Sequence, residues 1–146
     1  MKIRISKEFS FEMAHALDGY DGLCRNIHGH SYQLTVTLSG EPISDIASPK
    51  YGMVMDFGDL KHVVQNAIIN RFDHAFVVRI GTVGHFDNDK LFSRLLEVDF
   101  QPTSENLLVY IASLLIPALP EGVSLYSLRL RETGTSYAEW FAADNS

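Results

Sequence analysis

The stretch HGHSYQLTVTL, residues 28–38, alternates between two kinds of side chain. One side of the alternation carries imidazole, aromatic and aliphatic groups, at His28, His30, Tyr32, Leu34, Val36 and Leu38. The other side carries small or polar groups, at Ser31, Gln33, Thr35 and Thr37. Because successive side chains of a strand point to opposite faces, this period of two predicts a strand with one buried face.

The N-terminal segment shows the same period. Its second half places apolar side chains and one imidazole on a common face, at Phe9, Phe11, Met13 and His15. Ile3 and Ile5 also share a face, and the break between the two groups predicts a bulge near Ser6–Lys7. We therefore expect a first strand over residues 1–15, joined to the second by a loop over residues 16–27.

Two segments have the period of a helix. Between residues 56 and 71 an apolar stripe runs through Leu60, Val63, Val64, Ala67 and Ile68. Asp56 is placed to cap the start of this helix. PTSEN, residues 102–106, predicts a second helix start, with Thr103 as the cap and Glu105 in the first turn, where the helix dipole favours an anion. Residues 81–90 are rich in Gly, Asp and Asn and predict a loop.

Two strands are expected at the C-terminal end. The first alternates Tyr126, Leu128, Leu130 and Glu132 against Ser127, Arg129 and Arg131, and the second is SYAEWF, after the turn at Gly134. The order strand, strand, helix, helix, strand, strand predicts an α+β domain over residues 1–146. Its four-stranded antiparallel sheet would carry two helices on one face. The open edges of such a sheet favour oligomerisation by strand pairing.

Composition narrows the class of protein. The 146 residues are 46% hydrophobic and 21% charged, with a net charge of −6 and no basic run, which excludes the cationic footprint of a duplex nucleic-acid binder. The most apolar segment, residues 107–119, is too short to span a membrane. MKIRISKEF lacks the apolar run of a signal peptide, and a single cysteine cannot form an internal disulfide. These features predict a cytoplasmic protein.

The histidines are candidates for a metal site. His28 and His30 point the same way along a strand, with Cα atoms roughly 6.5 Å apart. If the first two strands form a hairpin, His15 lies near them, and three imidazoles with an open fourth position are typical of catalytic zinc. The alternative is that each histidine is a partly buried polar residue bonded to the backbone.

Three other positions carry candidate chemistry. Cys24 lies just before the histidines, where a metal ion would favour its thiolate, although an isolated cysteine is often a small buried hydrophobe. Asp73 and His74 are neighbours that would point apart on a strand, so they act together only if the backbone turns or the pair serves another chain's site. Glu132 lies on an apolar face and needs a partner, either an arginine or a ligand with paired N–H donors. The loop residues His85, Asp87 and Asp89 are expected to form a solvated face.

Six motifs resemble those of one known family. FEMAHAL, CRNIHGHSY, YGMVMDFGDLK, FDHAF, PTSEN and RETGTSYAEW follow the order and spacing of the 6-pyruvoyl tetrahydropterin synthase and 6-carboxytetrahydropterin synthase family. The resemblance covers the chain apart from about residues 79–100. It implies a tunnelling fold, in which the sheets of several subunits join into a barrel, commonly as two stacked trimers with active sites at subunit interfaces.

The resemblance also implies roles for individual residues. His15, His28 and His30 would bind zinc, and Cys24 would be the proton-abstracting thiolate. Asp73 and His74 would be its relay partners, and Glu132 would anchor the pterin ring.

The short C-x3-H-G-H spacing and MVMDFGDLK resemble the carboxy-forming bacterial branch of the family. This implies conversion of 7,8-dihydroneopterin triphosphate to 6-carboxytetrahydropterin, with loss of triphosphate and acetaldehyde, in queuosine and deazapurine biosynthesis. The open alternatives are a pyruvoyl-forming reaction, an aldolase-type cleavage of dihydroneopterin, and a non-enzymatic zinc-binding or pterin-binding module. Two departures from the family are Val77 and Val78 after FDHAF, where leucine and asparagine are usual, and the longer segment at residues 79–100.

Overall fold

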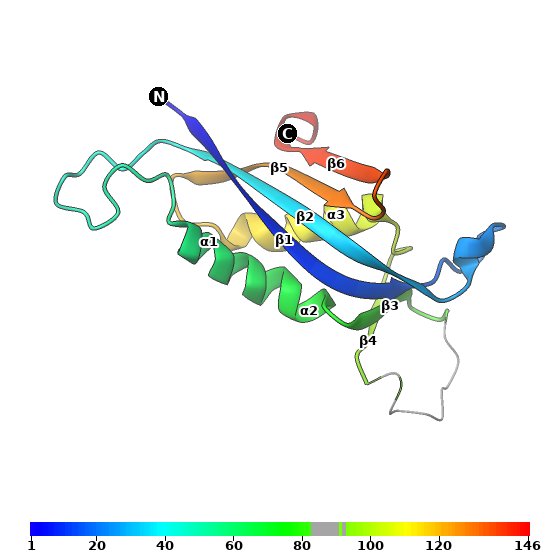
Figure 1. Ribbon diagram of the computed structural model, residues 1–146. Coiled ribbons are helices and arrows are strands. Elements are labelled where there is room, and N and C mark those ends of the chain that lie inside the picture. Colours follow the sequence, from blue (N-terminus) through cyan, green and yellow to red (C-terminus); the bar gives the residue numbers. More distant parts are fainter. Residues whose placement is uncertain (83–90, 92) are drawn as a thin grey trace.

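The computed structural model describes residues 1–82, 91 and 93–146, which form one curled sheet with helices packed against one face (Figure 1). The strands and α-helices, in chain order, are β1 Ile3–His15, β2 His28–Gly40, α1 Phe57–Val64, α2 Asn70–Phe72, β3 Ala75–Arg79, β4 Leu95–Val98, α3 Ser104–Leu115, β5 Val123–Arg131 and β6 Tyr137–Phe141. A π-helical turn, Gln65–Ile69, joins α1 to α2. Short 3₁₀ turns lie at Leu23–Arg25, Ile116–Ala118 and Ala142–Asp144.

The hairpin of β1 and β2 is the longest feature of the sheet. Its ladder runs without a break from Ile3 opposite Gly40 to His15 opposite His28, so the bulge predicted near Ser6–Lys7 is wrong. Lys7 occupies a position on the covered face, half-buried, with its Nζ 6.0 Å from the centre of the Phe9 ring. A lysine fits there because its aliphatic stem covers apolar surface while the ammonium group reaches water.

The predicted four-stranded antiparallel sheet is also wrong in two respects. The sheet of the described residues has six strands, in the order β4-β3-β1-β2-β5-β6. It is mixed, because β3 runs parallel to β1 and β4 runs parallel to β3. The missed strands are AFVVR and LLEV, which are short and show no alternation that would separate a strand from a buried loop.

Both predicted helices are confirmed, including their caps. Asp56 accepts a hydrogen bond from the Gly58 amide at 2.6 Å, and Thr103 accepts one from the Asn106 amide at 3.3 Å. The helix that starts at Phe57 continues through the π-helical turn to Phe72, close to the predicted end. The helices bury their apolar stripes against the covered face of the sheet, where the core of the molecule lies.

A bulge in β5 changes which face Tyr126 occupies. Thr37 pairs with Ser127 and Leu38 with Leu125, so Tyr126 is the extra residue and not a member of the buried set as predicted. Its ring instead lies 3.8 Å from the Arg4 guanidinium.

The predicted loop at residues 81–90 lies almost wholly outside the described residues, and so do His85, Asp87 and Asp89. The structure describes only its first two residues, which belong to a turn. None of the described helices is long and apolar enough to cross a membrane.

Candidate metal centre and active site

The ladder of β1 and β2 brings three histidines to one end of the hairpin. His15 pairs directly with His28, and His30 lies two residues further along the same face of β2. The Nε2 atoms of His15 and His28 are 2.9 Å apart, and the ring of His30 lies 4.9 Å from that of His28. The convergence expected from the sequence is therefore present in a single chain.

Glu132 completes the cluster from the residue after β5. Its Oε1 lies 2.9 Å from His30 Nε2 and 3.6 Å from His15 Nε2. The four candidate ligand atoms all lie within 4.8 Å of one another, so the cluster could hold a metal ion. The partner that Glu132 needs on this face is thus a group of imidazoles and not an arginine.

Backbone carbonyls fix the orientation of two of the rings. His15 Nδ1 lies 2.8 Å from the Pro102 carbonyl oxygen, and His28 Nδ1 lies 2.7 Å from that of Asn26. A carbonyl can only accept, so each Nδ1 donates and the Nε2 of a neutral ring keeps its lone pair. Two lone pairs 2.9 Å apart repel each other unless a cation lies between them.

His30 is a further residue whose environment fits a bound cation. Its Nε2 is buried and makes no hydrogen bond, although Glu132 Oε1 lies 2.9 Å away. Buried polar atoms are rarely left without a partner. Three imidazole nitrogens and one carboxylate oxygen are ligands suited to zinc and to related divalent metals, so the residues fit a bound metal ion.

Burial controls the protonation of the innermost groups. The pKa of His15 is lowered mainly because the ring is buried, although its bond to the Pro102 carbonyl acts in the opposite direction. Burial also raises the pKa of Tyr32, and the negative charges of Glu132 and Cys24 act in the same direction. Tyr32 therefore keeps its proton. Its hydroxyl lies 3.5 Å from His15 Nδ1, so an uncharged group lines this side of the site.

Cys24 lies in the 3₁₀ turn Leu23–Arg25, in the loop beside the cluster. Its thiol is free and exposed, so the alternative of a small buried hydrophobe is wrong. The carbonyl of Cys24 accepts a hydrogen bond from the Leu17 amide at 3.0 Å, which ties the turn to the end of β1. The thiol is thus accessible for chemistry.

Asp73 and His74 form a pair because the backbone turns between them. His74 has a φ of 59°, and this left-handed conformation places its Nδ1 3.1 Å from Asp73 Oδ2. Glu12 holds the turn from β1, since its amide donates to Asp73 Oδ1 at 2.9 Å and its carbonyl accepts from the His74 amide at 2.6 Å. The Glu12 amide is the main reason that the pKa of Asp73 is lowered, and the contact with His74 acts in the same direction.

This pair lies apart from the histidine cluster. His74 and His30 both line a cavity of about 330 Å³ whose other walls include Glu12, Ala14, Gly29 and Ser31. These residues alternate with the clustered histidines along β1 and β2, so they belong to the opposite face of the sheet. Among the residues that the structure describes, no hydrogen bond or ion pair joins Asp73 or His74 to Cys24 or to the cluster.

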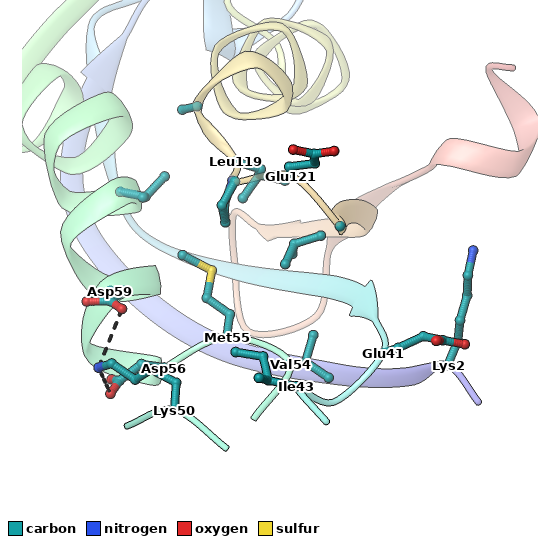
Figure 2. A pocket seen from close by; sticks show the side chains of 15 residues that line it. Lys2, Glu41, Ile43, Lys50, Val54, Met55, Asp56, Asp59, Leu119 and Glu121 are labelled. Carbon is teal, nitrogen blue, oxygen red and sulfur yellow. Dashed lines mark hydrogen bonds and ion pairs between the residues drawn. The ribbon is translucent and has the colours of Figure 1, made fainter. Parts of the chain in front are cut away.

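A larger cavity lies elsewhere in the described part of the chain. It has a volume of about 730 Å³ and an apolar lining that includes Val54, Met55 and Leu119 (Figure 2). Lys50, which pairs with Asp56 and Asp59, forms part of its rim. This cavity adjoins the Ile3 end of the hairpin, the end opposite the histidines, and its lining contains no histidine or cysteine.

Ser104 is a site residue that the sequence analysis missed. Its side chain is buried, and Oγ donates to Glu132 Oε2 at 2.7 Å. The sequence analysis used PTSEN as a helix start and as a family motif, and it gave Ser104 no role. Only the folded chain brings the first residue of α3 beside the end of β5.

Comparisons with known proteins show the family of this chain. The family model described as 6-pyruvoyl tetrahydropterin synthase matches residues 4–143. A 6-carboxy-5,6,7,8-tetrahydropterin synthase of Haemophilus influenzae is 42% identical over 145 residues, covering 94% of this chain and 97% of the relative. An enzyme of the same name from Synechocystis is 37% identical over 138 residues, covering 94% of this chain and 92% of the relative.

Solved structures share the fold. The 6-pyruvoyl tetrahydropterin synthase of Caenorhabditis elegans superposes with a TM-score of 0.70 at 24% identity, covering 97% of this chain and 96% of that one. The enzyme of the same name from Plasmodium vivax gives a TM-score of 0.74 at 18% identity, covering 96% and 97%. At these identities the likeness concerns the fold alone.

Proposed function

The chain belongs to the 6-pyruvoyl tetrahydropterin synthase family, and we propose that within it this protein is a zinc-dependent 6-carboxy-5,6,7,8-tetrahydropterin synthase. Its substrates would be 7,8-dihydroneopterin triphosphate and water, and a carbon–carbon lyase reaction would form 6-carboxytetrahydropterin and release acetaldehyde and triphosphate in queuosine and deazapurine biosynthesis. The observation that carries the proposal is the 42% identity to the Haemophilus influenzae synthase across 94% of this chain.

In this proposal His15, His28 and His30 hold the zinc ion. The two carbonyls that fix His15 and His28 present unprotonated Nε2 atoms to the metal, as the ligand role requires. Zinc, when bound, supplies a Lewis acid and a template for the oxygen atoms of the substrate side chain. Tyr32, buried and uncharged behind His15, keeps water from that side of the ring.

Glu132 has two candidate roles beside the metal. It could be a fourth ligand through Oε1, or it could hold the pterin ring by accepting two parallel N–H bonds. We propose the second role, because three histidines then leave a metal position open for substrate. Ser104, bonded to Oε2, fixes the carboxylate in either case and leaves further lone pairs on both oxygens.

Cys24 and the Asp73–His74 pair would move protons on opposite sides of the reacting carbon. The exposed Cys24 thiolate would take one proton, and His74, oriented by Asp73, would exchange another. In one chain the pair lies on the sheet face opposite the cluster, so we propose that it serves the site of a neighbouring subunit. The assembly we infer is a hexamer of two stacked trimers, with active sites between subunits.

The remaining expectations fit this activity. Residues 1–146 would act as one domain, since the metal ligands, the thiol and the pair are spread from His15 to Glu132. A reaction that depends on a free, exposed thiol is suited to the reducing cytoplasm.

Product analysis by mass spectrometry tests the proposed reaction. We expect the zinc-loaded protein to convert 7,8-dihydroneopterin triphosphate to 6-carboxytetrahydropterin and acetaldehyde. A pyruvoyl product would instead place the protein in the sister branch, and cleavage of unphosphorylated dihydroneopterin would indicate an aldolase.

Cys24→Ala separates an enzyme from a binding module. The substitution should abolish turnover while the zinc content stays at the wild-type level, because Cys24 is no ligand in this proposal. Turnover at the wild-type rate in Cys24→Ala would contradict the assigned role of the thiol.

A further inference from the structure

Arg94 comes from the connection between β3 and β4, the part of the chain that the family motifs do not cover. Its guanidinium donates two hydrogen bonds, one from Nη2 to the Asn70 carbonyl at 2.8 Å and one from Nε to the Asp73 carbonyl at 3.1 Å. Its own carbonyl accepts a hydrogen bond from the Phe76 amide at 3.0 Å. Arg94 therefore contacts the chain before, at and after the Asp73–His74 turn.

The contacted carbonyls are those that the end of a helix leaves without partners. The last four carbonyls of a helix have no intrahelical donor, and an arginine can satisfy them while its charge is favourable at the negative end of the helix dipole. α2 ends at Phe72, and Asp73 is already extended, with φ −62° and ψ 125°. Arg94 bridges this end of the helix, where the chain leaves the helical path.

The turn that follows needs such support. His74 has a positive φ without being glycine, a conformation that persists when surrounding contacts impose it. Glu12, on β1, stabilises the turn through two hydrogen bonds. Arg94 holds the same turn through its own hydrogen bonds. Its positive charge also helps to lower the pKa of Asp73, after the larger effects of the Glu12 amide and His74.

We propose that Arg94 is a positioning residue, which holds the Asp73–His74 turn in the arrangement that brings Asp73 Oδ2 to His74 Nδ1. We call the two hydrogen bonds of the Arg94 guanidinium the clamp. A cavity of about 470 Å³ lies over this turn and is lined in part by Asp73, His74 and Arg94, so the clamp leaves the pair open to a neighbouring molecule. The catalytic consequence of this clamp rests on the proposed function, whereas the clamp itself does not. Through the Arg94 side chain, the segment between β3 and β4 thus helps to position the Asp73–His74 pair.

Hydrogen exchange at the His74 amide tests the clamp without using activity. In the zinc-loaded protein this amide donates to the Glu12 carbonyl, and its exchange reports opening of the turn. We expect Arg94→Ala to speed this exchange at least about fivefold. The matched control is Arg71→Ala, which removes an exposed arginine from α2 whose hydrogen bond goes to the Tyr110 hydroxyl. No acceleration in Arg94→Ala, or equal acceleration in Arg71→Ala, would overturn the proposal.

Steady-state kinetics test the consequence for the reaction. Because misplacing the pair affects proton transfer and not substrate binding, Arg94→Ala should lower kcat about tenfold and leave KM within about twofold. Arg94→Lys should recover part of kcat, since an ammonium group keeps the charge but cannot span both carbonyls as a fork. An unchanged kcat in Arg94→Ala would refute the positioning role. If the wild-type protein itself forms no product, the proposed function fails, and the exchange experiment alone decides on the clamp.

Discussion

Two backbone carbonyls decide which nitrogen of His15 and His28 faces the centre of the cluster. Pro102 and Asn26 each occupy an Nδ1 atom, so both Nε2 lone pairs point to one place. The carbonyl of Pro102 precedes α3 and that of Asn26 precedes β2, so the folded chain fixes the tautomers before any metal arrives. Such a site is preorganised for a cation.

Removing the hydroxyl of Ser104 should weaken substrate binding. The bond from Ser104 Oγ to Glu132 is to a charged group, and bonds of this kind contribute about 1.5–3 kcal/mol. We expect Ser104→Ala to raise KM about tenfold or more, because the carboxylate loses its fixed orientation. Steady-state kinetics on the pterin substrate measure this change. Ser113→Ala is the matched control, since this serine lies in the same helix and bonds only to a backbone carbonyl. An equal KM in both variants would contradict the role of Ser104.

Asp73 should make stability depend on pH in a defined direction. Its folded-state pKa lies below the ordinary value of 3.8, chiefly because of the Glu12 amide. A depressed carboxyl pKa gives a stabilising contribution that is complete above the unfolded-state pKa and disappears as the pH falls through the folded-state pKa. The stability advantage of the wild type over Asp73→Asn should therefore shrink as the pH falls below about 4. Urea unfolding of both proteins from pH 6 to pH 2.5 measures it, and a constant difference would contradict the prediction.

The sequence predicted the candidate ligands well because short-range geometry governs them. An H-x-H spacing on a strand places His28 and His30 on one face whatever the rest of the fold does. The left-handed turn at His74 was not predicted, because a positive φ is uncommon outside glycine even though histidine adopts it more often than most residues. The contact of Ser104 with Glu132 also escaped, since it joins residues 28 apart in the chain.

At the scale of elements, strong local signals were sufficient for the helices and the hairpin. Asp56 and Thr103 are caps in the structure as in the sequence. The parallel strands β3 and β4 depend on partners that are distant in the chain, and their short apolar runs carry no signal of pairing. The bulge at Tyr126 likewise results from the pairing of β5 with β2 and leaves no mark in the alternation of side chains.

The cap at Asp56 should have a measurable effect on stability. Replacing an aspartate cap by alanine typically costs about 1 kcal/mol, because the first helical amides lose their acceptor. For a chain of this size we expect Asp56→Ala to lower Tm by about 3 °C, measured by thermal unfolding. Asp56→Ser keeps an acceptor at the cap and should recover most of the loss. A Tm equal to that of the wild type in Asp56→Ala would show that the cap contributes little.

At the scale of the whole molecule, the two halves of the proposed chemistry lie on opposite faces of one sheet. The histidine cluster faces the helices, and His74 lines a cavity at the other face that His30 of the cluster also reaches. Among the described residues, no hydrogen bond or ion pair joins the Asp73–His74 pair to the metal ligands within a single chain. Assembly of several chains, as the family resemblance implies, remains the prediction that would unite them.

Co-expression of two inactive variants tests this arrangement. Cys24→Ala and His74→Ala should each be inactive alone. If each site takes Cys24 from one subunit and His74 from another, random mixing leaves about a quarter of the sites with both groups intact. We expect about a quarter of wild-type turnover per site in the mixed oligomer. Absence of turnover in the mixture would contradict sites shared between subunits.

The central claim is that the cluster of His15, His28 and His30 is the metal centre of a pterin synthase. The most direct measurement is the rate of 6-carboxytetrahydropterin formation by chelator-treated protein as zinc is added back in known amounts. The rate should rise linearly and break at one zinc per chain, and His28→Ala should show neither tight binding nor turnover. Full turnover in metal-free protein, or a wild-type titration curve in His28→Ala, would contradict the account.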